Sequence, residues 1–378
     1  MTNVRQATIP LAQPNIGPLE RELIEQVLRS DTLAMGPFTE EFETELAALA
    51  DRRYAVAVSS GTAGLHLAVR ALGLTAGDEV LTTPFSFVAS ANCLLYEGAH
   101  PVFVDIEEET LGLDPDQLTA AITSRTRAVL PVHVFGHPCR IDALSSIAEE
   151  RGLGMIEDSC EALGSRLHGR PMGSFGSLSV FAFYPNKQIT TGEGGMVLTD
   201  DPQMASALRS MRNQGRDEDG TWLRHVRLGY NYRIDELSAA LGVAQLRRLV
   251  ELRSGRDRVV QAYRQMLGSS PWLRLPAVAE GAEVDWFVFV IRVDEALDRN
   301  RLIQQLSQRG VPSRPYFTPL HLQPIYRERF GYKEGDFPIT EKVAARTLAL
   351  PFSSRLTDHQ VEHVCGALLE SIEEQLRS

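Results

Sequence analysis

Between Tyr54 and about Asp200, short apolar runs alternate with amphipathic helical segments. This alternation is typical of an α/β domain. Several of the runs are apolar almost throughout, as strands covered on both faces should be. We therefore predict seven strands in a large domain: Tyr54–Val58, Glu79–Thr82, Pro101–Asp105, Ala128–Val134, Gly154–Asp158, Leu178–Phe183 and Gly195–Thr199.

Helical spacing predicts segments between these strands at Ala63–Leu72, Ala89–Glu97 and Ile141–Arg151, followed by one long connecting helix at Ile234–Met266. After Pro271 the pattern changes to a strand at Trp286–Val293 and helices at Arg299–Arg309 and Asp358–Leu376. We expect a large domain over residues 1–250 and a smaller C-terminal α+β domain over 251–378, and leave open that about the first 15 residues pack on the small domain.

The net charge and the cysteine spacing exclude several classes of protein. The 378 residues carry a net charge of −11, which excludes the basic footprint of a nucleic-acid binder. The four cysteines form no zinc spacing, so we expect reduced thiols, no metal and a cytoplasmic protein. No signal-peptide core and no run of membrane-spanning length is present, so no membrane association is expected.

Ligands of open α/β sheets bind at the carboxyl ends of strands, and polar residues follow three of the predicted strands. Small residues at Ser59–Gly64 precede a helix, where free N–H groups can hold a phosphate, although such a turn can equally be a tight connection. Asp158 ends a buried strand and needs a cationic partner such as a protonated pyridine nitrogen; a helix cap or an arginine pair is the alternative.

Lys187 follows an apolar strand and precedes a Gly-rich turn. Desolvation there can make it a nucleophilic amine, although most lysines are solvated surface residues. A phosphate turn, a carboxylate and a lysine, each at a strand end in chain order, form the layout expected of a pyridoxal-phosphate site.

Seven stretches carry a resemblance to a known family: SGTAGLHLAVRALGLTAGDEVLTTPFSFVASAN, PVFVDI, PVHVFGHPCRID, IEDSCEALGS, FAFYPNKQITTGEGGMVLTD, LGYNYRIDELSAALGVAQL and PYFTPLHLQPIYRERFGYKEGDFP. In this order they resemble the sugar-nucleotide aminotransferases of the aspartate-aminotransferase, fold-type I class. The resemblance runs from Gly17 to the last helix. It implies a mixed, mostly parallel seven-stranded sheet flanked by helices, a homodimer with active sites at its interface, and L-glutamate as amino donor.

By this resemblance, Lys187 carries the cofactor and shuttles a proton, and Asp158 pairs with the pyridinium nitrogen. Phe87 stacks on the ring, while Gly61 and Thr62 hold the phosphate. A ping-pong transfer follows, in which glutamate leaves as 2-oxoglutarate before the keto-sugar accepts the amine.

Three further assignments also rest on the resemblance. Glu161 contacts the phenolic oxygen, where relatives have Gln or His, and Asn231 reaches the phosphate from the partner subunit. The family's serine five residues before the lysine is Ala182 here, so a water or one of Ser59, Ser60 and Ser179 has to compensate.

For the substrate, NKQITTGEGGM and Glu161 resemble enzymes that aminate carbon 4 of a 4-keto-6-deoxy hexose, such as perosamine synthases, in cell-surface polysaccharide synthesis. Amination at carbon 3 stays an alternative. Tyr316 and His321 of the PYFTPLH segment would approach the sugar nucleotide, although Tyr316 can equally be packed between prolines.

The sequence opposes three other functions. A related sugar dehydratase has His in place of the cofactor lysine, and Lys187 opposes it. A nicotinamide-dependent Rossmann enzyme lacks support because no GxGxxG follows the first strand. A non-catalytic regulator with this fold is opposed by the presence of both Lys187 and Asp158.

Overall fold

The computed structural model describes residues 9–217 and 221–377. Its α-helices are α1 (Pro18–Leu28), α2 (Pro37–Leu49), α3 (Gly61–Ala71), α4 (Ala89–Tyr96), α5 (Pro115–Ala121), α6 (Ile141–Glu150), α7 (Pro202–Arg212), α8 (Glu236–Arg247), α9 (Leu249–Leu267), α10 (Arg299–Gln308), α11 (Pro324–Phe330), α12 (Pro338–Ala344) and α13 (Asp358–Leu376). Its strands are β1 (Tyr54–Val58), β2 (Glu79–Thr82), β3 (His100–Phe103), β4 (Thr126–Leu130), β5 (Gly154–Asp158), β6 (Arg166–Leu167), β7 (Arg170–Pro171), β8 (Leu178–Ala182), β9 (Gly195–Thr199), β10 (Leu273–Arg274), β11 (Ala282–Glu283), β12 (Phe289–Val293) and β13 (Thr347–Leu350).

The main sheet has seven strands in the order β1-β9-β8-β5-β4-β2-β3. Strand β9 runs antiparallel to both of its neighbours, and the pairs from β8 to β3 are parallel. The predicted α/β class with a mixed, mostly parallel seven-stranded sheet is therefore confirmed. Two small three-stranded sheets, β10-β12-β13 and β11-β6-β7, complete the strand pairing.

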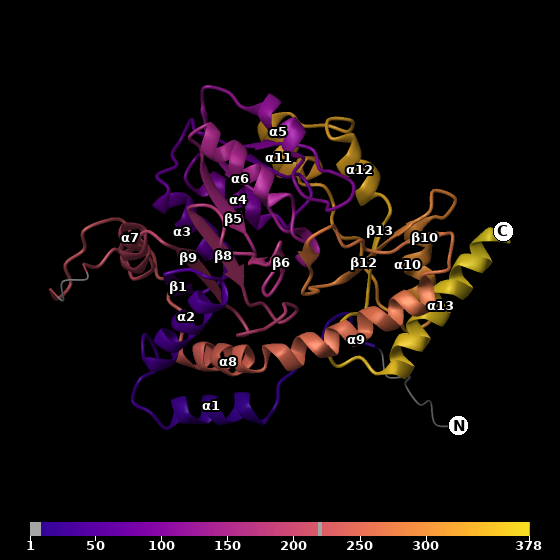
Figure 1. The fold of residues 1–378 in the computed structure, drawn as a ribbon, viewed down its shortest axis with the longest axis horizontal. Coiled ribbons are helices and arrows are strands. Elements are labelled where there is room, and N and C mark those ends of the chain that lie inside the picture. The colour runs from indigo at the N-terminus through magenta and orange to yellow at the C-terminus, as the bar shows by residue number, and fades with distance from the viewer. Residues whose placement is uncertain (1–8, 218–220, 378) are drawn as a thin grey trace.

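Helices cover both faces of the main sheet. Successive side chains of a strand point to opposite faces, so an apolar strand has apolar side chains to bury on each face. In β1, Val56 and Val58 join the buried cluster that contains helix α3, whereas Ala55 and Ala57 join the cluster that contains α2 and α8. Figure 1 shows α3 and α2 close to this end of the sheet, with α8 and α9 running in line below the body. Burial on both faces explains why these strands are apolar almost throughout.

Several predicted boundaries differ from the structure, and two of them are wrong by more than three residues. The strand expected at Ala128–Val134 is β4, which ends at Leu130. Pro131 follows, lacks an N–H for the sheet, and leads into a 3-10 turn at Val134–Gly136, η1. The single helix expected at Ile234–Met266 is two helices, α8 and α9, which meet at Arg248, whose backbone leaves the helical geometry at φ −99° and ψ 5°.

A second buried cluster lies around the β10-β12-β13 sheet and the helices α9, α10 and α13. Its members are drawn from the chain between Val259 and Ile372, and Ile9 also belongs to it. The carbonyl of Leu11 accepts a hydrogen bond from the Phe352 N–H at 2.8 Å. The end of the described N-terminal segment thus packs beside this cluster. The domain boundary at residue 250 stays a prediction.

Among the described residues, no helix combines the length and the apolar composition that crossing a bilayer requires.

Candidate active site

Three strands with the same direction bring the predicted site together. Strand β9 is antiparallel to both β1 and β8, and β8 is parallel to β5, so β1, β5 and β8 end at one edge of the sheet. Ser59 to Thr62 follow β1, Asp158 ends β5, and Lys187 lies in the turn after β8. This strand arrangement explains why three motifs spread along the chain from Ser59 to Lys187 meet.

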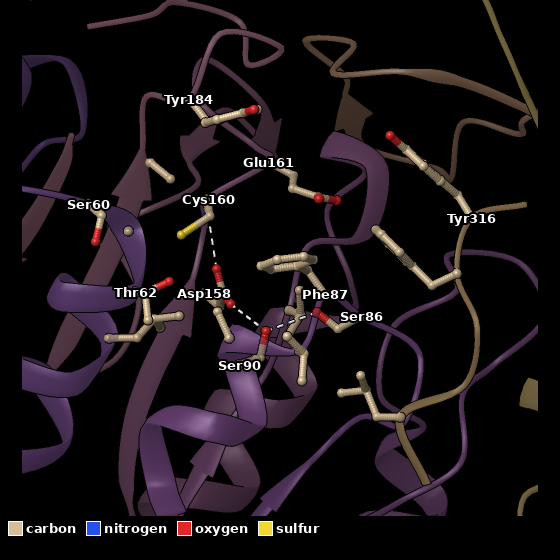
Figure 2. Close-up of a pocket in the computed structure, with 18 of the residues that line it drawn as sticks. Ser60, Thr62, Ser86, Phe87, Ser90, Asp158, Cys160, Glu161, Tyr184 and Tyr316 are labelled. Carbon is tan, nitrogen blue, oxygen red and sulfur yellow. Dashed lines mark hydrogen bonds between the residues drawn. The ribbon is translucent and has the colours of Figure 1, made fainter. Parts of the chain in front are cut away.

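A pocket of about 970 Å³ lies at this edge, and Figure 2 shows its interior. Ligand pockets commonly measure about 300–1,000 Å³, so there is room for a cofactor and a second ligand. Seven of the predicted site residues line it: Gly61, Thr62, Phe87, Asp158, Glu161, Lys187 and Tyr316. The side chain of Phe87 is 60% exposed and therefore offers a ring face to the cavity.

The phosphate turn forms the start of helix α3. Ser60 is its N-cap and accepts a hydrogen bond from the Ala63 N–H at 3.1 Å, which leaves the N–H groups of the first residues free. A Cβ on Gly61 would lie 2.5 Å from the Ala182 Cβ, and one on Gly195 would lie 2.5 Å from the Ser60 carbonyl oxygen. Glycine is therefore required where β8 and β9 approach this turn.

The hydroxyl groups that were candidates to compensate for Ala182 differ in position. Ser60 lines the pocket. Ser179 is fully buried and donates to the Gly173 carbonyl at 2.5 Å, away from the lining, and Ser59 is not among the lining residues either. Of these three serines, Ser60 alone has a place on the pocket wall.

Asp158 is held in place by neutral donors. Its Oδ2 accepts from the Ser90 hydroxyl at 2.7 Å, and its Oδ1 accepts from the Cys160 N–H at 3.1 Å (Figure 2). Ser90 in turn lies 2.9 Å from the Ser86 hydroxyl. In the described part of the chain, no ion pair to Asp158 is found, although only 4% of the residue is exposed. A buried carboxylate without a cation fits a cationic ligand nitrogen.

Lys187 points into the same cavity and has two close partners. Its Nζ lies 4.1 Å from the centroid of the Phe287 ring and 3.4 Å from Glu161 Oε1. Its backbone carbonyl accepts from the Arg256 guanidinium at 2.6 Å, and that guanidinium also donates to the Gln188 carbonyl at 2.7 Å. Helix α9 thereby holds the lysine turn from behind.

Glu161 is buried between the lysine and the chain after β4. Its Oε2 accepts a hydrogen bond of 2.9 Å from the Phe135 N–H, and Phe135 adopts a left-handed φ of 60° to present it. Burial raises the pKa of the Glu161 carboxyl above its ordinary value, although Lys187 and the Phe135 N–H act in the opposite direction. The protonated carboxyl is therefore favoured more here than in water.

Asn231 and His321 do not line this pocket. Asn231 is exposed and lies between α7 and α8, next to Tyr232, whose carbonyl accepts a hydrogen bond from the Ser59 N–H at 2.8 Å. His321 is fully buried, and its Nε2 lies 3.0 Å from Glu341 Oε1. The structure therefore brings Tyr316, and not His321, to the cavity, because His321 is turned into the packing of the chain near α12.

Several lining residues were not among the predicted ones. Ser86 lies in the loop before α4 and Ser90 in the first turn of that helix, and their hydroxyl oxygens are 2.9 Å apart. Asn186 has a buried Oδ1 without a hydrogen-bond partner in the described chain. Phe287 comes from the other end of the sequence, and nothing in its local pattern indicates this role.

These observations fit pyridoxal phosphate. A helix N-terminus faces one end of the cavity, an exposed ring forms a wall, and Asp158 and Lys187 supply an unpaired carboxylate and an amine. The unsatisfied Asn186 oxygen is one more acceptor for a ligand. Among the described residues, no group of three or more metal-ligating side chains is found.

Comparisons with known proteins agree with this reading. A family model described as the DegT/DnrJ/EryC1/StrS aminotransferase family matches residues 14–369. The spore coat polysaccharide biosynthesis protein SpsC of Bacillus subtilis is 37% identical over 385 residues, which cover 98% of this chain and 99% of that protein.

Two solved structures are similar over nearly the whole chain. The PLP form of Spr1654, a putative sugar aminotransferase of Streptococcus pneumoniae, is 28% identical with a TM-score of 0.93 and covers 97% of this chain and 99% of that one. DesI, solved in the presence of its TDP-sugar product, is 34% identical with a TM-score of 0.90 and covers 98% and 94%.

The resemblance to the sugar-nucleotide aminotransferases, the aminotransferase class and the cofactor pyridoxal phosphate are thus confirmed, and the nicotinamide-dependent and non-catalytic alternatives are wrong. The chain belongs to the DegT/DnrJ/EryC1/StrS aminotransferase family.

Proposed function

We propose that this enzyme transfers the amino group of L-glutamate to carbon 4 of a nucleotide-linked 4-keto-6-deoxy hexose, in a cytoplasmic step of polysaccharide biosynthesis. The observation that carries the proposal is the meeting of the α3 N-terminus, Asp158 and Lys187 in one large pocket. DesI, with its TDP-sugar product, and SpsC, a polysaccharide biosynthesis protein, support the substrate class. A 3-keto sugar nucleotide is the alternative, and a dehydratase is opposed by Lys187.

The cofactor, when bound, supplies the electron sink that lets an amino group leave one carbon and join another. Asp158 would pair with its ring nitrogen and keep that nitrogen protonated, because Ser90 and the Cys160 N–H already hold the carboxylate in place. Lys187 would hold the cofactor and then move a proton at the amino-bearing carbon. Phe87 would cover the ring face.

Glu161 would contact the phenolic oxygen of the cofactor. Its raised pKa favours a protonated carboxyl, which can donate a hydrogen bond to that oxygen where a carboxylate would repel it. The Phe135 N–H occupies Oε2, so Oε1, which accepts from Lys187 Nζ at 3.4 Å, is the oxygen that would reach the cofactor held by that lysine.

Gly61, Thr62 and Ser60 would hold the phosphate at the start of α3. Asn231 is exposed and outside the pocket of its own chain, which fits a role in the pocket of a second copy. We therefore propose a homodimer in which each Asn231 completes the phosphate site of the other subunit.

An active-site complementation experiment tests this arrangement. Lys187→Ala and Asn231→Asp are each expected to be inactive as homodimers. When the two variants are co-expressed in equal amounts, half of the dimers are mixed and each mixed dimer has one intact site, so about a quarter of wild-type activity returns. If Asn231 acted within its own chain, no activity would return.

The reaction would proceed in two half-reactions, in which 2-oxoglutarate leaves before the keto-sugar binds. Tyr316 lies on the side of the pocket formed by the C-terminal part of the chain, where it would contact the sugar nucleotide (Figure 2). Burial and the nearby Glu161 raise the pKa of the Tyr316 hydroxyl, so it stays a hydrogen-bond donor at neutral pH.

The proposed function is tested by incubating the purified protein with L-glutamate and either a 4-keto-6-deoxy or a 3-keto sugar nucleotide. Mass spectrometry should detect an amino sugar nucleotide from the 4-keto substrate, with one 2-oxoglutarate per amine. Product from the 3-keto substrate alone would move the site of amination, and no amine from either would contradict the proposal.

A further inference from the structure

A second charged hollow lies in the C-terminal part of the chain, apart from the pocket described above. Its volume is about 180 Å³, and it is lined by residues of the β10-β12-β13 sheet, by the end of α12 and by Glu108. Four of the lining side chains are cationic, Arg274, Arg292, Lys342 and Arg346. The lining carboxylates are Glu108 and Asp294, and Glu295 pairs with Arg346 from beside the hollow, so four cations face three carboxylates, in a protein with a net charge of −11.

The sheet register places two of these cations side by side. Arg274 of β10 and Arg292 of β12 are directly paired across the two antiparallel strands. Like charges directly opposite one another destabilise a sheet. Burial, Arg274 and Arg346 lower the pKa of the Arg292 guanidinium against the opposing effect of Glu108. The cluster is therefore short of negative charge.

One carboxylate is shared among three of the cations. Glu108 Oε1 lies 3.0 Å from the Arg274 guanidinium and 3.1 Å from that of Arg292, and Glu108 Oε2 lies 4.0 Å from Lys342 Nζ. Arg346 pairs with Glu295, whose side chain is 73% exposed. Asp294 is engaged by the Ala296 N–H at 3.0 Å. Glu108 thus partly occupies a place where a more highly charged anion would be better matched.

We propose that this hollow binds the diphosphate group of an anionic ligand. Arginine guanidinium groups match phosphate oxygens in geometry, and the four cations can each pair with a charged oxygen of a diphosphate. The hollow is large enough for a diphosphate and too small for a whole nucleotide. A nucleoside attached to the diphosphate would lie over the half-buried Trp272, which forms part of the wall.

Calorimetric titration of pyrophosphate into the cofactor-loaded enzyme, at low ionic strength and without divalent cations, tests the site. The double variant Arg274→Gln/Arg346→Gln removes two partly exposed charges and is expected to weaken binding by at least about tenfold. Arg29→Gln is the matched control, because Arg29 is an exposed arginine in an isolated pair with Glu25. Equal binding by the double variant and the wild type would overturn the proposal.

Glu108→Gln gives an independent and opposite prediction. If Glu108 occupies the cations in place of the ligand, its neutralisation should tighten pyrophosphate binding by about three- to tenfold, and weaker binding would contradict the proposal.

A nucleoside diphosphate distinguishes the source of the ligand. Tighter binding than pyrophosphate, lost in Trp272→Ala, would identify a nucleotide, and equal binding of the two would identify inorganic diphosphate.

Discussion

The Nζ of Lys187 lies 4.1 Å from the centroid of the Phe287 ring. The two residues are a hundred positions apart, and Phe287 lies two residues before β12 of the second sheet. The C-terminal part of the chain therefore contributes to the surroundings of the proposed cofactor lysine. Phe287 lines the pocket and contacts the amine with its ring.

Replacing Phe287 by Leu should slow the reaction at saturating substrate. A cation–π contact is worth about 0.5–2 kcal/mol, so kcat is expected to fall by about two- to thirtyfold. Phe287→Tyr keeps an aromatic face and should stay within about twofold of the wild type. Equal kcat values for the Leu and Tyr variants would show that the ring face has no role.

Asp158→Asn should separate cofactor binding from catalysis. The amide has the shape of the carboxyl group but carries no charge to keep the ring nitrogen protonated, so turnover should fall by more than about 100-fold. Ser90→Ala removes only one hydrogen bond to the same carboxylate and should cost about tenfold or less. If both variants lost the same small factor, the charge of Asp158 would not matter.

Glu161→Gln tests the protonation of this buried carboxyl. The wild-type side chain loses its proton as pH rises through its raised pKa, whereas the amide remains a donor at every pH. The variant should therefore be active near neutral pH and keep its kcat/KM at alkaline pH better than the wild type. Superimposable pH profiles would mean that Glu161 does not change its charge in this range.

The raised pKa of the buried Asp285 carboxyl predicts that the stability of the protein depends on pH. Burial raises its pKa to about 7, and neither carboxylate oxygen has a hydrogen-bond partner in the described chain. The folded state binds this proton more tightly than the unfolded state. The free energy of unfolding therefore falls as pH rises from about 4 to about 7, and this loss persists at higher pH. The Tm of Asp285→Asn minus that of the wild type should therefore increase between pH 5 and pH 8. A constant difference would contradict the assignment.

The strands next to the site could be predicted from sequence because they are buried on both faces. The bounds of β1, β2, β5 and β9 agree with the apolar runs. The β4 prediction failed where Pro131 outweighed an apolar continuation. Helices α1 and α2 were not predicted, although each begins with a proline that follows a glycine, a known start signal.

The site could be predicted only in part, for physical reasons. Asp158 and Lys187 were found because Asp158 ends one recognisable strand and Lys187 lies in the turn after another. Phe287 and Arg256 reach the lysine through tertiary packing, and neither local pattern carries that information. His321 was assigned by resemblance, but the fold turns it away from the pocket and toward Glu341.

The most direct test of the central claim is the absorption spectrum of the purified enzyme, loaded with pyridoxal phosphate, before and after addition of L-glutamate. The wild type should show a visible band from the lysine-bound cofactor that shifts to shorter wavelength with glutamate, and Lys187→Ala should lack the initial band. A wild-type protein without such a band in the presence of pyridoxal phosphate, or a Lys187→Ala variant with the wild-type spectrum, would contradict the assignment of Lys187.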